Sequence, residues 1–218
     1  MNAVWLAVTV LLFGGLRRAE RPWSRGWALP VAAVALWGGL NVFGVPPAAY
    51  SAATGLLTFW LGPATVAMAV PLVRHWPAIA RRWPRVLVGV GAGAAVSTGI
   101  AALLSWWWGL GPLWRSVLPH TATTPIALPL VAALGGTPAL GAVATVLTGL
   151  VGSLIGPAGL GRMGIQDPLA QGVALGAASS GIGTARALAE SPAMGAVAGL
   201  AMALAGLAVT AMVLPWAR

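Results

Sequence analysis

Long runs without any charged side chain constrain this sequence more than any other feature. Residues 26–73 and 116–161 contain no Arg, Lys, Asp or Glu, and a helix needs about 20 apolar residues to cross the hydrocarbon core of a bilayer. Each run is therefore long enough for two membrane-spanning helices. Only 7% of all residues are charged, whereas about 25% is usual in a soluble domain. The sequence predicts a membrane protein that crosses the bilayer several times.

The uncharged runs predict an all-α polytopic fold with about seven or eight transmembrane elements. Three kinds of segment separate the elements: Pro-Pro at 46–47, Gly-Gly-Thr-Pro at 135–138, and the segments that carry arginine. The predicted elements are Asn2–Leu16, two within Gly26–Val73, Val86–Leu110, two within Ser116–Gly161, Asp167–Glu190 and Ala193–Trp216.

The two halves of the chain, residues 1–110 and 111–218, share one rhythm of apolar runs and breaks. Each begins with two spans, continues with a broken element and ends with a long uncharged helix. The broken elements are Ala49–Val73, interrupted at Gly62-Pro63, and Asp167–Glu190, interrupted at 180–183. Paired discontinuous helices in two repeats are typical of secondary transporters. We therefore expect one membrane domain made of two structural repeats.

The net charge of +9 is concentrated in two arginine segments, Arg17–Arg25 and Arg74–Arg85. Positive segments between spans usually face the cytoplasm and its anionic lipids, so we expect both on that side and expect no nucleic-acid binding. An even number of crossings must then separate them, which requires Ala49–Val73 to cross fully. For Asp167–Glu190, a full crossing and a re-entrant hairpin both fit.

Three segments place polar or helix-breaking residues inside apolar runs, where unpaired backbone groups are costly unless protein or a water-filled cavity supplies partners. The first contains Gly62, Pro63 and Thr65. Proline suits the first turn of a helix, so a new helix should start at Pro63, with its free amides and the Thr65 hydroxyl near the membrane centre. The alternative is a proline kink packed by neighbouring helices.

The second segment contains Thr123, Thr124 and Pro125. Thr124 should cap a helix whose first residue is Pro125, so that hydroxyls and amides face the same cavity as Pro63. The alternative is an ordinary cap at the membrane surface, because Arg115 lies close by.

The third segment combines small residues with hydroxyls, which lets the backbone unwind and approach a ligand closely. Arg186 follows one turn later and is the only cation of this region. An arginine at membrane depth needs an anionic partner, either Glu190 four residues on or a carboxylate substrate held by its guanidinium group. The candidate binding residues of this segment are Ser179, Ser180, Gly181, Gly183, Thr184 and Arg186.

Asp167, His120 and Glu190 are the candidates for coupling transport to an ion. The competing interpretation of Asp167-Pro168, and of Ser191-Pro192, is a cap at a helix start near the interface. The acidic and histidine residues are too few and too dispersed for a carboxylate pair, a metal site or a Ser/His/Asp arrangement, and the chain has no cysteine. We therefore expect no enzyme activity, no metal and no cofactor.

These segments, and the order in which they follow one another along the chain, resemble the LrgB/CidB family of bacterial membrane proteins. The resemblance runs from about Tyr50 to the end of the chain. This chain departs from the family at Pro119-His120, where Pro-Lys is usual, at Ser179-Ser180, where Ser-His is usual, and at Arg186, where Lys is usual. The matching motifs are Leu61–Leu72, Thr123–Ala127, Gly135–Leu140, Thr148-Gly149, Gly156-Pro157, Gly181–Ala185 and Gly199–Met202.

The resemblance implies two functions. Bacterial members were named as antiholin-like or holin-like regulators of murein hydrolase export and autolysis, acting with a small LrgA/CidA-type membrane partner. A related plant plastid protein moves glycolate and glycerate, and bacterial relatives are linked to pyruvate handling. The hydroxyls, amides and single arginine favour a secondary transporter of small monocarboxylates. We expect it in the bacterial inner (plasma) membrane as a homo-oligomer, such as a dimer.

Overall fold

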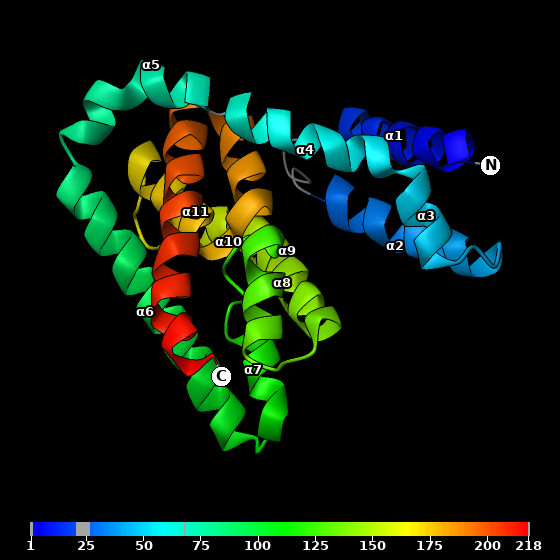
Figure 1. Ribbon diagram of the computed structural model, residues 1–218. Coiled ribbons are helices and arrows are strands. Elements are labelled where there is room, and N and C mark those ends of the chain that lie inside the picture. Colours follow the sequence, from blue (N-terminus) through cyan, green and yellow to red (C-terminus); the bar gives the residue numbers. More distant parts are fainter. Residues whose placement is uncertain (1, 21–26, 68, 218) are drawn as a thin grey trace. The chain divides into compact units, whose positions relative to one another are not determined.

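The computed structural model describes residues 2–20, 27–67 and 69–217, apart from the side chains of Asn2, Ala3, Leu61 and Thr65. All of the regular structure in this part of the chain is helical (Figure 1). The predicted all-α class is therefore confirmed.

The first of two compact units covers Met1–Ala67. Its helices are α1 (Asn2–Ala19), α2 (Ala28–Val42), α3 (Pro47–Ala53) and α4 (Gly55–Ala67). Thr9 Oγ1 and the Tyr50 hydroxyl lie 3.0 Å apart and join α1 to α3. The Trp5 ring packs edge-to-face against Tyr50. These contacts tie the short helix α3 to α1.

The second compact unit covers Met68–Arg218. Its helices are α5 (Ala69–Ala80), α6 (Trp83–Trp107), η2 (Gly111–Leu113), α7 (Trp114–Val117), α8 (Thr124–Ala133), α9 (Pro138–Arg162), α10 (Pro168–Glu190), α11 (Pro192–Val213) and η3 (Leu214–Trp216). Helix α11 is central, because it contacts α5, α6, α8 and α10. The predicted organisation into two repeats, with a boundary at 110/111, stays a prediction.

The core of the second unit lies along α11. Val197, Ala201, Ala205 and Val209 recur every four residues and are at most 1% exposed, so they share one buried face. The first three pack in one cluster with residues of α5 and α6, whereas Val209 packs in a second cluster with residues of α6, α8 and the loop before α8. Helix α11 therefore connects both ends of the unit.

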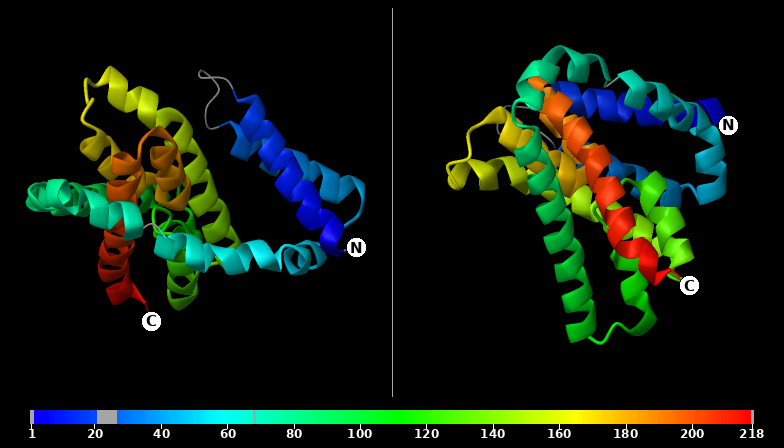
Figure 2. Two further views of the ribbon diagram at one scale, coloured as in Figure 1. Left: turned by 90° about the horizontal axis from the view of Figure 1, so that it is seen from above. Right: turned by 60° about the vertical axis from the view of Figure 1, so that its left-hand side comes forward.

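Glycines bring the backbones of α10 and α11 together, and these helices lie side by side in each view (Figures 1 and 2). A Cβ atom at Gly176 would lie 2.0 Å from the carbonyl oxygen of Ala198. One at Gly172 would lie 2.6 Å from the carbonyl oxygen of Met194. Close approach through small residues is how helices associate in hydrocarbon, where apolar burial gives little driving force.

Four segments of the described chain are long and apolar enough to cross a bilayer, namely Gly55–Ala80, Trp83–Trp107, Pro138–Arg162 and Pro192–Trp216. The first of these includes Met68, which lies outside the described residues. The prediction of a multi-pass membrane protein is therefore confirmed, with four candidate spans in the described part of the chain. The predicted pair of spans within Ser116–Gly161 is wrong, because the 10 residues of α8 rise only about 15 Å against a core of about 30 Å.

Two further predicted boundaries are wrong. Helix α4 runs through Pro63, so no new helix starts there: a proline removes one backbone hydrogen bond, and the helical turns on both sides persist without it. The segment Arg74–Arg85, expected as a loop between two spans, is largely helical, because Arg74 lies in α5 and Arg85 in α6. Helix α5 is held against the core by Ile79, whose side chain is fully buried.

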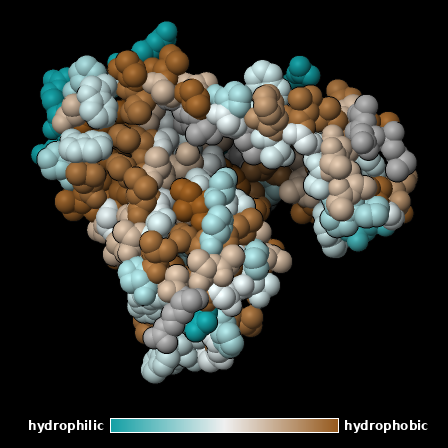
Figure 3. All heavy atoms as spheres, viewed as in Figure 1, coloured by the Kyte–Doolittle hydropathy of each residue, from teal (hydrophilic) through white to brown (hydrophobic). Residues whose placement is uncertain are grey.

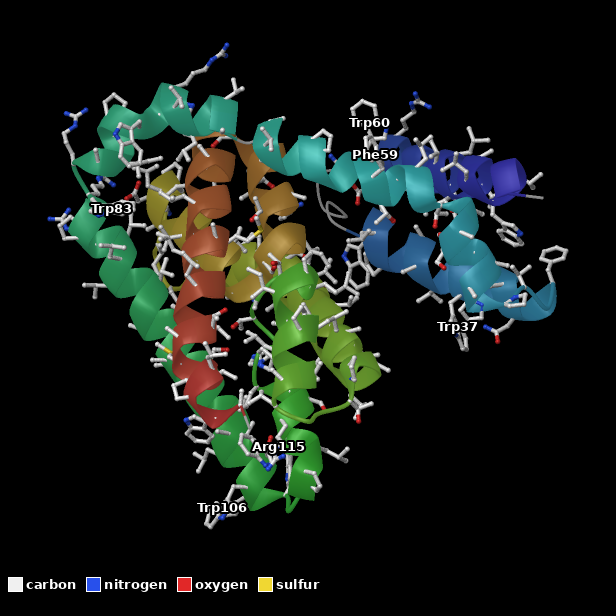
Figure 4. All side chains as sticks on the ribbon, viewed as in Figure 1. Trp37, Phe59, Trp60, Trp83, Trp106 and Arg115 are labelled. Atoms are coloured by element: carbon white, nitrogen blue, oxygen red, sulfur yellow. The ribbon has the colours of Figure 1, made fainter. Side chains whose placement is uncertain are left out.

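The surface of the second unit matches a membrane environment. Apolar residues spread along α6 and α11, and hydrophilic residues gather along α5 and at its corner with α6 (Figure 3). Trp83 lies where α6 begins and Trp106 where it ends (Figure 4), and Trp106 is 77% exposed. Tryptophan is enriched at membrane–water interfaces, so α6 has an interface residue at each end.

The Gly176 contact yields a stability prediction. Gly176→Ala should lower the free energy of unfolding by about 1–3 kcal/mol, because the new methyl group forces α10 away from the Ala198 carbonyl. Gly91→Ala in α6 is the control, since its Cβ would meet no atom within 4 Å. Thermal unfolding in detergent, followed by tryptophan emission, should give a lower Tm for the first variant alone. Equal Tm values would contradict the close packing of α10 on α11.

Candidate functional site

Helix α10 leaves helical geometry at one residue. Ser180 has φ 52° and ψ −138°, a region that residues with a Cβ rarely adopt. The helix continues on both sides, so the departure is a kink. Gly183 makes the tight bend fit, because a Cβ there would lie 2.3 Å from the Leu175 carbonyl oxygen. The kink falls within 180–183, the stretch in which an interruption is predicted.

Two buried hydroxyls flank the kink. Ser179 is 1% exposed, and its Oγ has no hydrogen-bond partner among the described residues. Gly152 of α9 leaves room for this side chain, since a Cβ at Gly152 would lie 1.9 Å from Ser179 Oγ. Thr184 Oγ1 donates to the Ser180 carbonyl oxygen at 2.9 Å. Ser179 therefore holds unused hydrogen-bonding capacity, which is unusual for a buried group.

Arg186 lies two residues after Thr184 and pairs with Glu190. Its Nη2 is 2.7 Å from Glu190 Oε1, and its side chain is 15% exposed. The Nε of the same guanidinium is buried without a partner in the described part of the chain. Two anionic partners are predicted for Arg186, Glu190 and a carboxylate substrate, and the structure shows the pair with Glu190. The arrangement still leaves one charged donor unsatisfied, which is costly in a low-dielectric environment.

The threonine segment lies at the start of α8, with one correction. Thr123 is the N-cap, and Thr124 and Pro125 are the first two helical residues, so the predicted cap at Thr124 is wrong by one position. The Thr123 carbonyl accepts the amides of Ile126 and Ala127 at 2.8 Å. Thr123 has extended backbone angles, φ −63° and ψ 146°, so the chain enters the helix at Thr124. Pro125 is tolerated at the second helical position because the amides of the first turn have no partner within the helix.

Helix α11 brings the starts of α8 and the second half of α10 near each other. Met202 Sδ lies 3.7 Å from Thr184 Oγ1, and a Cβ at Gly206 would lie 2.7 Å from Ile126 Cδ1. Met202 and Gly206 are one helical turn apart. Two of the three predicted segments therefore contact adjacent turns of one helix.

The remaining predicted segment lies in the first unit. Gly62 and Pro63 are exposed residues within α4, and the Thr65 side chain lies outside the described residues. Their predicted role in the same anion site stays a prediction.

The two carboxylates and the histidine proposed for ion coupling have separate surroundings. Asp167 caps α10 by accepting the Leu169 amide at 3.3 Å and pairs with Arg82. Ser191 caps α11 by accepting the Met194 amide at 3.1 Å. The competing interpretation of Asp167 and Ser191 as helix caps is therefore confirmed, and Glu190 belongs to the Arg186 pair.

His120 lies in the turn between α7 and α8, outside the four candidate spans. Its Nε2 is 3.0 Å from Ser97 Oγ of α6, and its Nδ1 is 3.0 Å from the Val117 carbonyl oxygen. Burial lowers the pKa of His120 below its usual value, while the hydrogen bonds to the backbone oppose this shift. The imidazole is therefore held neutral at pH 7.

Sequence reasoning missed three groups around these sites. Gly152 is needed for the position of Ser179, and Ser97 contacts His120, as described above. Thr98 Oγ1, next to Ser97, is a buried hydroxyl without a partner among the described residues. The signal for the latter pair is the Ser97-Thr98 dipeptide within an otherwise apolar span, whereas nothing local distinguishes Gly152 from other helical glycines.

Comparison with known proteins identifies relatives over most of the chain. A family model described as the LrgB-like family matches residues 9–218. Uncharacterized protein YwbG of Bacillus subtilis (strain 168) is 35% identical over 210 residues, covering 95% of this chain and 93% of YwbG. Uncharacterized protein YxaC of the same strain is 34% identical over 116 residues, covering 53% of this chain and 50% of YxaC. No solved structure matches.

The backbone conformation of Ser180 predicts that one substitution there will stabilise the protein. Ser180→Gly should raise the free energy of unfolding by about 1 kcal/mol, because glycine adopts a positive φ without steric cost. Ser180→Ala keeps the Cβ and should give no such gain. Thermal unfolding in detergent distinguishes them, and an equal gain in both variants would show that the hydroxyl, not the backbone, is the source of strain.

The burial of His120 yields a pH prediction. Above pH 6.5 the imidazole is neutral in both folded and unfolded chains, so it contributes no pH dependence. Below pH 6.5 the unfolded chain binds the proton more readily, because the folded-state pKa is lowered, and stability falls. The Tm should therefore decrease from pH 7 to pH 5, and His120→Gln should reduce this decrease. An unchanged decrease in the variant would assign it to other groups.

Proposed function

The chain belongs to the LrgB-like family of membrane proteins, and we propose that it is a secondary transporter of small monocarboxylates of the glycolate, glycerate, pyruvate and lactate type. The observation that supports this most directly is a pair of unused donors in α10, one beside the kink and one in the helix that follows it. Ser179 Oγ and Arg186 Nε are both buried without partners among the described residues. A carboxylate can accept hydrogen bonds from both a hydroxyl and a guanidinium.

The chemistry of the site fits one carboxylate at a time. Arg186 has several donors in a planar fork, and Glu190 occupies Nη2, which leaves Nε for a substrate oxygen. Near the bend, Ser179 and Thr184 provide hydroxyls, and Gly181 provides exposed backbone, while the buried Gly183 allows the bend itself. Glu190 holds the Arg186 side chain in place when no substrate is bound.

Transport requires that this site opens to each side of the membrane in turn. We assign the movement to the two repeats, 1–110 and 111–218, and the segment at Thr123 contributes to the site of the second unit. This is the arrangement by which discontinuous helices bind substrate near the membrane midplane. The arginine segments would face the cytoplasm of a bacterial plasma membrane, and a dimer is the proposed assembly.

The test is counterflow of labelled glycolate, pyruvate and lactate into liposomes that contain the purified chain alone. Arg186→Gln should reduce exchange by about tenfold or more, because a charge-assisted hydrogen bond to a buried carboxylate contributes roughly 1.5–3 kcal/mol. Arg162→Gln, at the exposed end of α9, is the matched control and should exchange normally. Thr184→Val should also reduce exchange.

A second variant separates substrate binding from folding. Arg186→Gln leaves Glu190 without its guanidinium partner, whereas the double variant Arg186→Gln/Glu190→Gln removes both charges and should fold normally while staying inactive. Equal exchange by the wild type and both variants would contradict the proposed site. Leak of a neutral dye together with the carboxylates would instead favour a holin-like protein, and a need for an LrgA/CidA-type partner would favour the antiholin-like regulator of murein hydrolases.

A further inference from the structure

A cavity of about 340 Å³ lies in the second unit, where the turn between α5 and α6 meets the start of α10. Its floor is apolar and includes Ile79 and Val197, which are both 0% exposed. Its mouth carries the exposed side chains of Arg82, Arg85 and Asp167. The volume corresponds to about eleven molecules of liquid water, enough for a headgroup-sized fragment and not for a whole lipid.

The mouth of this cavity carries a net positive charge. Arg82 pairs with Asp167, while Arg85 makes no ion pair within the described part of the chain. The first turn of α6 contains no acidic residue, and its N-cap Arg82 makes no side-chain capping bond, so the helix adds a partial positive charge at the same place. The cavity therefore favours an anion at its opening.

The position of α6 in the membrane sets the depth of the mouth. Helix α6 is a candidate span that begins at Trp83, whose ring packs 5.9 Å from that of Trp76. Three exposed tryptophans, Trp106–Trp108, lie at its other end. Tryptophans at both ends place the start of α6 at the lipid–water interface. Arg82 and Arg85 then lie at the level of lipid phosphates, and the apolar floor lies beside them.

We propose that this cavity binds one anionic phospholipid. The phosphate contacts Arg85 and Arg82, and the glycerol backbone with the first methylene groups packs against Ile79 and Val197. An amphiphile contacts both the charged mouth and the apolar floor of the cavity, whereas a soluble anion contacts only the charged mouth. Asp167 competes with the phosphate for Arg82, so its charge weakens binding. This site is separate from the α10 kink and does not depend on the proposed transport activity.

Native mass spectrometry of the full chain in neutral detergent tests the proposal, with dioleoylphosphatidylglycerol and dioleoylphosphatidylcholine as probes. The first lipid should bind with a Kd about tenfold or more lower than the second. Arg85→Gln should remove most of this preference, because it removes the unpaired cation. Arg74→Gln, an exposed arginine of α5 outside the cavity, is the matched control and should keep it.

Asp167→Asn provides a variant that should bind the lipid more tightly. Asparagine caps a helix as well as aspartate does, so the start of α10 is kept while the charge that competes for Arg82 is removed. A Kd for phosphatidylglycerol several-fold below that of the wild type is expected. The proposal is overturned if the two lipids bind equally, if Arg74→Gln loses as much preference as Arg85→Gln, or if millimolar glycerol 3-phosphate displaces the lipid completely.

Discussion

At Gly176 the backbone of α10 approaches α11 so closely that no side chain fits between them. Much of the second unit depends on this contact. Hydrocarbon gives helices little reason to associate through apolar burial, so contact has to come from van der Waals packing of small surfaces. Gly172 and Gly176 provide such a surface against Met194 and Ala198. Helix α11 in turn contacts α5, α6 and α8, which makes it the shared partner of the unit.

This close packing explains how polar groups persist at the kink. Ser179 and Thr184 are nearly fully buried, and Thr184 satisfies its own hydroxyl with the Ser180 carbonyl. Ser179 and Arg186 keep unsatisfied donors, a cost that the surrounding helices must offset. Buried groups without partners are rare in native proteins, and each calls for an explanation such as stored strain, a functional role or a bound water or ion. The combination of a strained residue, an unpaired hydroxyl and a partly satisfied arginine within one helix therefore sets α10 apart from its neighbours.

Local signals in the sequence are sufficient to predict part of this architecture. The long helices α6, α9 and α11 follow from uncharged runs, and the caps at Asp167 and Ser191 follow from Asp-Pro and Ser-Pro. Pro63 and Thr124 were misjudged because a proline restricts the backbone without determining whether a helix starts there. The contact of Ser97 with His120 and the space that Gly152 leaves for Ser179 were out of reach, since each joins segments far apart in the sequence. For the site, the sequence located Ser179, Thr184 and Arg186 on one broken element but left two alternative anionic partners for the arginine.

The three candidate spans that lie wholly in the second unit, Trp83–Trp107, Pro138–Arg162 and Pro192–Trp216, each have 25 residues. A helix of that length rises about 37 Å, which exceeds a hydrocarbon core of about 30 Å. Helices with such a mismatch tilt, or leave their ends among the lipid headgroups. Because α11 contacts α6 and α10, and α10 contacts α9, these helices cannot tilt independently. A change in bilayer thickness therefore acts on the unit as a whole, and membranes of different thickness impose different tilts on the segment that carries the kink.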